Sequence, residues 1–108
     1  MKIEHAGNTL RVSEVAELDA ATASSFQDTV EAAVTDAITH IEVDLADTVF
    51  LDSCGLGTLV ALRKLVGNRG GVVRLLNPGP SVRQMLELTR LYRVLEVVKR
   101  EEIGATPT

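Results

Sequence analysis

The stretch Val49-Phe50-Leu51-Asp52-Ser53-Cys54-Gly55-Leu56-Gly57 decides the fold, because it lies where the chain leaves a strand and enters a helix. At such a point ligands and partners commonly meet an open α/β sheet. Asp52 or Ser53 is suited to cap the helix, since its side-chain oxygen can accept a hydrogen bond from a free backbone N–H. Gly55 and Gly57 permit a tight turn and close helix packing. We therefore expect the functional residues in this stretch.

Downstream of this stretch, helix and strand patterns alternate. Apolar residues follow helical spacing over residues 55–67, and a glycine-rich run then ends the helix. Residues 72–76 are almost continuously apolar, which is typical of a strand covered on both faces. Ser81 is placed to cap a third helix that carries Val82, Met85, Leu86 and Leu88, and residues 94–98 predict a weak last strand.

Upstream, the pattern predicts two short strands, one helix and one more strand. Residues 1–5 and 9–15 read as antiparallel neighbours, because the Gly7-Asn8 pair between them readily adopts positive φ in a tight turn. Residues 20–39 show the periodicity of an amphipathic helix that begins at Asp19 or Thr22. Residues 41–45 alternate between apolar and acidic side chains, as in a half-buried strand.

This order of elements predicts one α/β domain. The sheet should be mixed and mostly parallel, with four to five strands covered by three to four helices. A length of 108 residues, 45% of them hydrophobic and 24% charged, suits a single globular domain. We expect its core within about residues 9–98 and a loose C-terminal tail over about residues 100–108.

The composition argues against several classes of protein. The N-terminus lacks the apolar run of a signal peptide, and no stretch reaches the roughly 20 apolar residues that span a bilayer, so we expect a cytoplasmic protein without a membrane segment. One cysteine and two histidines give neither a disulfide nor a metal-ligand cluster. A net charge of -4, basic residues interleaved with acidic ones and three aromatic residues argue against nucleic-acid binding.

Three enzymatic interpretations of the same stretch are weaker than the binding interpretation. Gly55 and Gly57 lack the third glycine of a dinucleotide-binding fingerprint, and no lysine follows in the position that a P-loop requires. Ser53 or Cys54 as a nucleophile needs a base, and the two histidines stand on an edge strand and at the end of the first predicted helix. Cys54 itself is a small hydrophobe unless exposure and the helix N-terminus activate it.

The same residues resemble a known family. Residues 49–57 are similar to the aliphatic-x-x-Asp-Ser-Ser/Thr-Gly-Leu-Gly signature of STAS-domain anti-anti-sigma factors, also called anti-sigma factor antagonists. The resemblance continues in residues 15–19 and 81–86 and covers residues 9 to about 98. Ala16 departs from the usual glycine. Cys54 departs from the usual serine or threonine, which removes an alternative phosphoacceptor.

The resemblance implies a bacterial binding switch and not an enzyme. In that family the serine at the position of Ser53 is phosphorylated, and the unphosphorylated protein binds a GHKL-type serine kinase that doubles as anti-sigma factor, which frees a sigma factor. A serine phosphatase restores the free form, and no cofactor is involved. The implied chain is a monomer or weak dimer. The implied partner-binding residues are Asp19, Asp52, Ser53, Cys54, Gly55 and Leu56.

Two alternatives remain open at this point. In the first, the chain is a STAS subunit of a lipid transporter or of a sensor scaffold and controls no sigma factor. In the second, it is a small hydrolase that uses Ser53 or Cys54. The intact pair of Asp52 and Ser53 favours the switch over the first alternative, because STAS proteins that do not switch can dispense with a phosphoacceptor.

Overall fold

The computed structural model describes residues 1–93 and 95–98. The chain opens with strands β1 (Lys2–Ala6) and β2 (Thr9–Ser13), which pair antiparallel as predicted. Of the two turn residues, Gly7 alone has a positive φ, at 62°. A glycine adopts this conformation without the steric cost that a side chain would bring.

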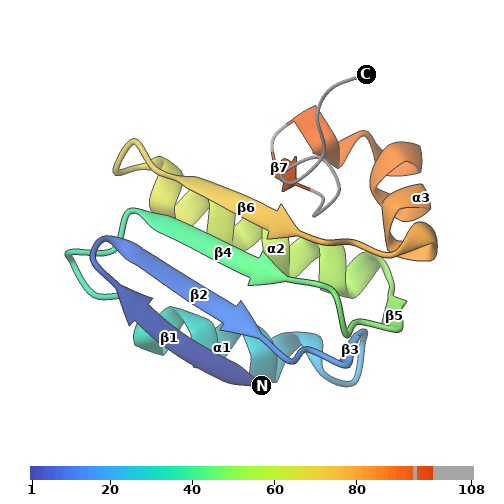
Figure 1. Cartoon of the computed structure of the whole chain (residues 1–108), viewed down its shortest axis with the longest axis horizontal. Coiled ribbons are helices and arrows are strands. Elements are labelled where there is room, and N and C mark those ends of the chain that lie inside the picture. Colours follow the sequence, from blue (N-terminus) through green and yellow to red (C-terminus); the bar gives the residue numbers. More distant parts are fainter. Residues whose placement is uncertain (94, 99–108) are drawn as a thin grey trace.

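The main sheet has five strands in the order β1-β2-β4-β6-β7 (Figure 1). Strands β4 (His40–Asp44), β6 (Val72–Leu76) and β7 (Glu96–Val98) run parallel to β2, and β1 is the one antiparallel edge strand among the described residues. The predicted mixed, mostly parallel sheet is therefore confirmed. Val94 of the predicted last strand and the tail from residue 99 onward lie outside the described residues.

Helices α1 (Ala23–Ala33) and α2 (Ser53–Gly67) lie side by side on one face of this sheet (Figure 1). The inward side chains of the strands alternate with outward ones, as the pleat requires. The inward set packs against the apolar sides of both helices and forms one core. Its central members are fully or almost fully buried: Leu10, Val12, Ile41, Val43, Val73, Leu75, Phe26, Val30, Leu59, Leu62 and Val66.

Helix α1 is shorter than the predicted helix over residues 20–39. Val34 leaves the helical conformation, and Ile38 then donates its N–H to the Thr35 carbonyl in a turn. Ile38 is still only 1% exposed, because the turn carries its side chain back into the core. The apolar periodicity thus continues past the end of the helix, so periodicity alone overestimated its length.

The third helix, α3 (Pro80–Thr89), also begins differently from the prediction. Gly79 is the N-cap residue and Pro80 is the first helical residue, a position where proline needs no N–H donor. Ser81 is therefore inside the helix and does not cap it. Leu88, predicted among its apolar residues, is 74% exposed. A short 3-10 turn, η1 (Leu91–Arg93), follows.

The outer face of the sheet carries a row of alternating charges. Directly opposed positions on the five strands hold, in order, Glu4, Arg11, Glu42, Arg74 and Glu96. Arg74 lies 3.4 Å from Glu42 and 3.0 Å from Glu96. The expectation that β6 is covered on both faces is therefore wrong, because its central residue reaches solvent in this row.

A second, two-stranded sheet stands at one end of the molecule (Figure 1). Strands β3 (Glu17–Leu18) and β5 (Phe50–Leu51) pair in parallel there, beyond the carboxyl ends of β2 and β4 and next to the start of α2. Across residues 1–93 and 95–98, no helix has the length and apolar character needed to cross a bilayer.

Candidate functional site: the Ser53 rim

The residues singled out by the sequence gather at the end of the molecule that carries β3 and β5. We call this region, residues 16–22 and 48–57, the Ser53 rim. Backbone hydrogen bonds hold its two segments together: Val49 donates its N–H to the Ala16 carbonyl at 2.9 Å, and Asp52 donates its N–H to the Leu18 carbonyl at 3.2 Å. The rim is therefore a fixed backbone platform, because both strands are bonded to each other along their length.

Asp52 caps helix α2 and ties the two rim segments together. One carboxylate oxygen accepts the N–H of Gly55 at 3.0 Å, which satisfies a donor that the helix itself cannot pair. The other oxygen accepts the N–H of Ala20 at 3.0 Å. The sequence left the cap open between Asp52 and Ser53, and the structure assigns it to Asp52.

Ser53 is the first residue of α2 and is exposed to solvent. Since Asp52 caps the helix, the Ser53 hydroxyl is not needed as the cap. Cys54, the next residue, is also exposed, so it is not the small buried hydrophobe that the sequence allowed. The two side chains available for chemistry or contact at the helix start are thus those of Ser53 and Cys54.

Asp19 is half-buried and organises the turn that leads into α1. Its Oδ1 atom accepts the N–H groups of Ala21 at 3.0 Å and Thr22 at 3.1 Å. The Thr22 hydroxyl oxygen in turn accepts the N–H of Asp19 at 3.0 Å. Asp19 and Asp52 therefore belong to one hydrogen-bonded unit, because Ala20, beside Asp19, donates to Asp52.

Gly55 and Leu56 face the interior, unlike the other predicted contact residues. Leu56 is 5% exposed and belongs to the core. A Cβ atom on Gly55 would overlap the Leu18 carbonyl oxygen, so only glycine lets the helix approach β3 this closely. Both residues therefore have a packing role in the structure. Contact of either residue with a partner stays a prediction, because neither presents an accessible side chain.

Three further residues of this region were not among the predicted partner-binding residues. Val49 and Phe50 are 74% and 51% exposed, although such side chains in a strand usually face a core. Thr48 is buried and donates its hydroxyl to the Val15 carbonyl, which fixes the segment that precedes β5. A two-residue strand gives no alternation to read, so the exposure of Phe50 could not be predicted.

The rim belongs to the acidic part of the chain. Residues 12–62 contain ten aspartates and glutamates and no lysine or arginine, so the expected interleaving of charges does not hold there. Glu17, Asp19 and Asp52 lie on the rim itself. A partner surface that meets this rim is electrostatically favoured if it is basic.

Both histidines lie at the opposite end of the sheet from Ser53. His40 begins β4 and stands 2.7 Å from the Thr39 hydroxyl, while His5 pairs with Leu10 and reaches the Ala33 carbonyl at 2.9 Å. Strand β5 and the start of α2, whose first residue is Ser53, lie beyond the carboxyl ends of β4 and β6 (Figure 1). Neither imidazole is thus placed to act as a base toward Ser53 or Cys54.

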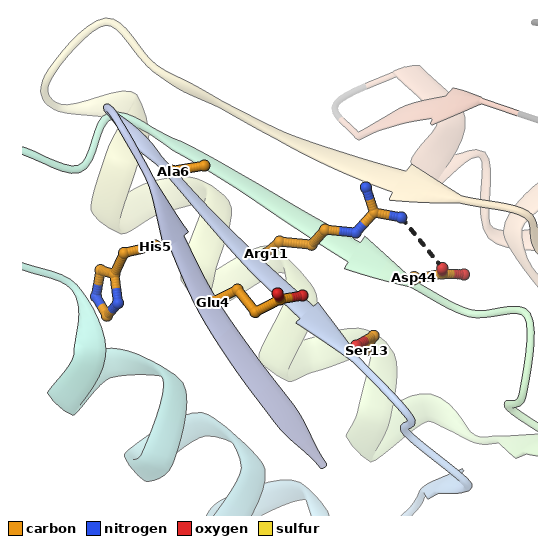
Figure 2. A pocket seen from close by; sticks show the side chains of 6 residues that line it. All are labelled: Glu4, His5, Ala6, Arg11, Ser13 and Asp44. Atoms are coloured by element: carbon orange, nitrogen blue, oxygen red, sulfur yellow. Dashed lines mark hydrogen bonds and ion pairs between the residues drawn. The ribbon is translucent and has the colours of Figure 1, made fainter.

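A shallow depression on the open face of the sheet is separate from the rim. It is lined by Glu4, His5, Ala6, Arg11, Ser13 and Asp44. Figure 2 shows Arg11 directed toward Asp44, with 3.4 Å between the charged groups, and the His5 ring on the other side of β1. Because Arg11 is already paired with Asp44, its charge is not free to attract an anionic ligand.

Comparison with known proteins identifies related chains. The family model of the STAS domain matches residues 1–103. A protein of Paenibacillus polymyxa named "Anti-sigma F factor antagonist" is 29% identical over 62 residues, which cover 57% of this chain and 53% of that protein. The matched region thus spans about half the length of that curated relative.

Solved structures share the fold. The anti-sigma factor antagonist SpoIIAA in its unphosphorylated form matches with a TM-score of 0.79 and 24% identity, over 94% of this chain and 90% of SpoIIAA. The phosphorylated Bacillus SpoIIAA matches with a TM-score of 0.71 and 23% identity, over 94% of each chain. An anti-sigma factor antagonist from Mycobacterium paratuberculosis matches with a TM-score of 0.78 and 28% identity, over 90% of this chain and 82% of that one.

Proposed function

Because this chain belongs to the STAS domain family, we propose that it is an anti-sigma factor antagonist that is controlled by phosphorylation of Ser53. The unphosphorylated form binds an anti-sigma factor of the GHKL serine-kinase type through the Ser53 rim and so releases a sigma factor. A serine phosphatase reverses the modification. The chain itself performs no catalysis and remains a monomer or weak dimer in the cytoplasm.

The observation that carries this proposal is the position of Ser53. Its hydroxyl is exposed on the first residue of a helix, next to a capping aspartate, on the rim that also exposes Val49 and Phe50. A kinase can reach such a hydroxyl without unfolding the domain. The likeness to SpoIIAA, a protein solved in both unphosphorylated and phosphorylated forms, supports the same assignment.

A phosphate at this place affects the fold and the interface differently. It adds a charge of about -1.5 to -2. At a helix N-terminus that charge faces unpaired N–H groups, an interaction worth about 0.3–1 kcal/mol. In the interface the same dianion joins Asp52 and must be desolvated, which costs about 2–5 kcal/mol if the partner offers no matching donors. Binding then weakens by roughly thirty-fold to a few thousand-fold.

The test compares Ser53→Ala with Ser53→Asp. We expect Ser53→Ala to bind the kinase as tightly as the wild type and to resist phosphorylation, and Ser53→Asp to bind at least tenfold more weakly. Each GHKL-type kinase of the source genome is purified, the one that binds the wild type is selected by calorimetry, and its phosphorylation of Ser53 is followed by intact mass.

The stability of the two variants serves as the control. Because Asp52 supplies the cap, we expect the free energy of unfolding of both variants to lie within about 0.5 kcal/mol of the wild-type value, as is usual for exposed substitutions. Equal kinase affinity for folded Ser53→Ala and Ser53→Asp would contradict the switch. Failure of the wild type to bind any of these kinases would remove the proposed function and favour the transporter or scaffold alternative.

A further inference from the structure

Two glycines stand in the first part of helix α2, and the structure explains only one of them. Gly55 is buried against the Leu18 carbonyl, where no larger residue fits. Gly57 is exposed, has no positive φ, and a Cβ atom placed on it would meet nothing within 4 Å. Glycine inside a helix is less stable than alanine. Within the described chain, therefore, Gly57 weakens the helix without any packing reason.

Because residue 57 has no side chain, part of the helix surface next to Ser53 is left uncovered. Residues four apart on a helix lie on the same side, one turn from each other. A helical side chain leans toward the N-terminus and covers the turn that precedes it. A side chain at residue 57 would therefore lie over the turn that carries Ser53. With glycine there, the backbone beside the Ser53 hydroxyl is bare.

We infer that Gly57 is a contact position for the anti-sigma factor, which packs directly on the bare backbone between Ser53 and Gly57. This inference rests on the proposed function and adds to the proposed contact residues of the rim one that supplies no side chain. The occupant is a basic segment of the anti-sigma factor, because the rim residues 16–22 and 48–57 include Glu17, Asp19 and Asp52 and no lysine or arginine.

The substitution Gly57→Ala separates this contact from folding. Since the new methyl group would meet nothing within 4 Å beyond the adjoining residues and backbone of its own helix, the variant should fold with a melting temperature about 2–6 °C higher than that of the wild type. Its affinity for the anti-sigma factor should fall at least tenfold, because the methyl group occupies the space of the partner. A variant that is more stable but binds more weakly cannot be explained by misfolding.

The matched control is Gly67→Ala at the other end of the same helix. A Cβ atom there meets only the flexible end of Arg63, at 3.7 Å. Ten residues of helix place it about 15 Å from Gly57. We expect Gly67→Ala to raise the melting temperature similarly and to leave the affinity unchanged.

Both variants are titrated beside Ser53→Asp against the purified kinase that binds the wild type, with thermal melts on the same samples. If Gly57→Ala binds like the wild type while Ser53→Asp binds weakly, the inference is overturned and the proposed function stands. If Gly57→Ala and Gly67→Ala lose the same affinity, helix stiffness and not contact is responsible, which also overturns it. If Ser53→Asp binds like the wild type, the phosphorylation switch itself fails.

Discussion

At the scale of single residues, each of the two carboxylate oxygens of Asp52 accepts a different backbone hydrogen bond. One caps α2 through Gly55 and the other holds Ala20. We expect Asp52→Ala to lose about 1–2 kcal/mol of stability, because both bonds disappear. Asp52→Asn should lose less, since asparagine is also a good cap but its amide nitrogen cannot accept the Ala20 N–H.

Urea denaturation together with amide hydrogen exchange separates the contributions of these two hydrogen bonds. The Ala20 amide should exchange faster in both variants, and the Gly55 amide should exchange faster in Asp52→Ala alone. Equal stability loss in the two variants would mean that the bond to Ala20, and not the cap, dominates. The same measurement shows whether the rim keeps its geometry when one of its two segments is released.

At the scale of elements, the charge row across the sheet contributes to stability through pairs of opposed strands. Arg74 stands between Glu42 and Glu96, and its hydrogen bond to Glu96 raises the pKa of the guanidinium. Such a group stabilises the fold fully below its unfolded pKa and loses the effect only as the pH rises past the folded value. Arg74 therefore stays charged at all ordinary pH values.

The substitution Arg74→Glu places like charges opposite one another on three neighbouring strands. We expect a loss of about 1–2 kcal/mol, because opposed pairs contribute roughly 0.2–1 kcal/mol each and like charges reverse the sign. The loss should shrink in about 1 M salt, where the screening length falls to about 3 Å. Arg74→Thr, a neutral residue suited to strands, is the control in urea denaturation, and equal losses for both variants would refute a charge effect.

The elements also show what a sequence can and cannot predict. Alternation and helical spacing predicted β4 and α2, because each has one side in a continuous core, whereas the Gly7-Asn8 turn predicted the pairing of β1 with β2. The same signal extended α1 too far, since Ile38 reaches that core from a turn. Strands β3 and β5 have two residues each, too few for any period, so their pairing depends on the tertiary structure. The place of Ser53 was predictable from its motif, whereas the exposure of Phe50 and Gly57 required the structure.

At the scale of the whole molecule, the proposed switch changes one end and leaves the sheet alone. The Ser53 rim lies beyond the carboxyl ends of the strands, while the core is enclosed between the sheet and the helices α1 and α2. We expect phosphorylation of Ser53 to leave amide exchange in β4 and β6 unchanged and to shift the melting temperature upward by at most a few degrees.

Hydrogen exchange and calorimetry on the fully phosphorylated protein decide this point. Faster exchange throughout β4 and β6, or a melting temperature lowered by about 10 °C or more, would show that the phosphate acts by loosening the domain. The expected result instead places the whole effect in the partner interface, where charge and desolvation act.

The exposed Cys54 has a practical consequence for such measurements. It is the only cysteine of the 108 residues, and it directly follows Ser53, the proposed phosphoacceptor. A maleimide dye will therefore attach at a single place, one residue from Ser53, and will report on local events there. The same uniqueness is a hazard in immobilisation, because coupling the protein to a resin through its thiol covers the Ser53 rim, which is the proposed kinase-binding surface. Attachment through an engineered group in the turn after α2, at the other end of that helix, keeps the rim accessible.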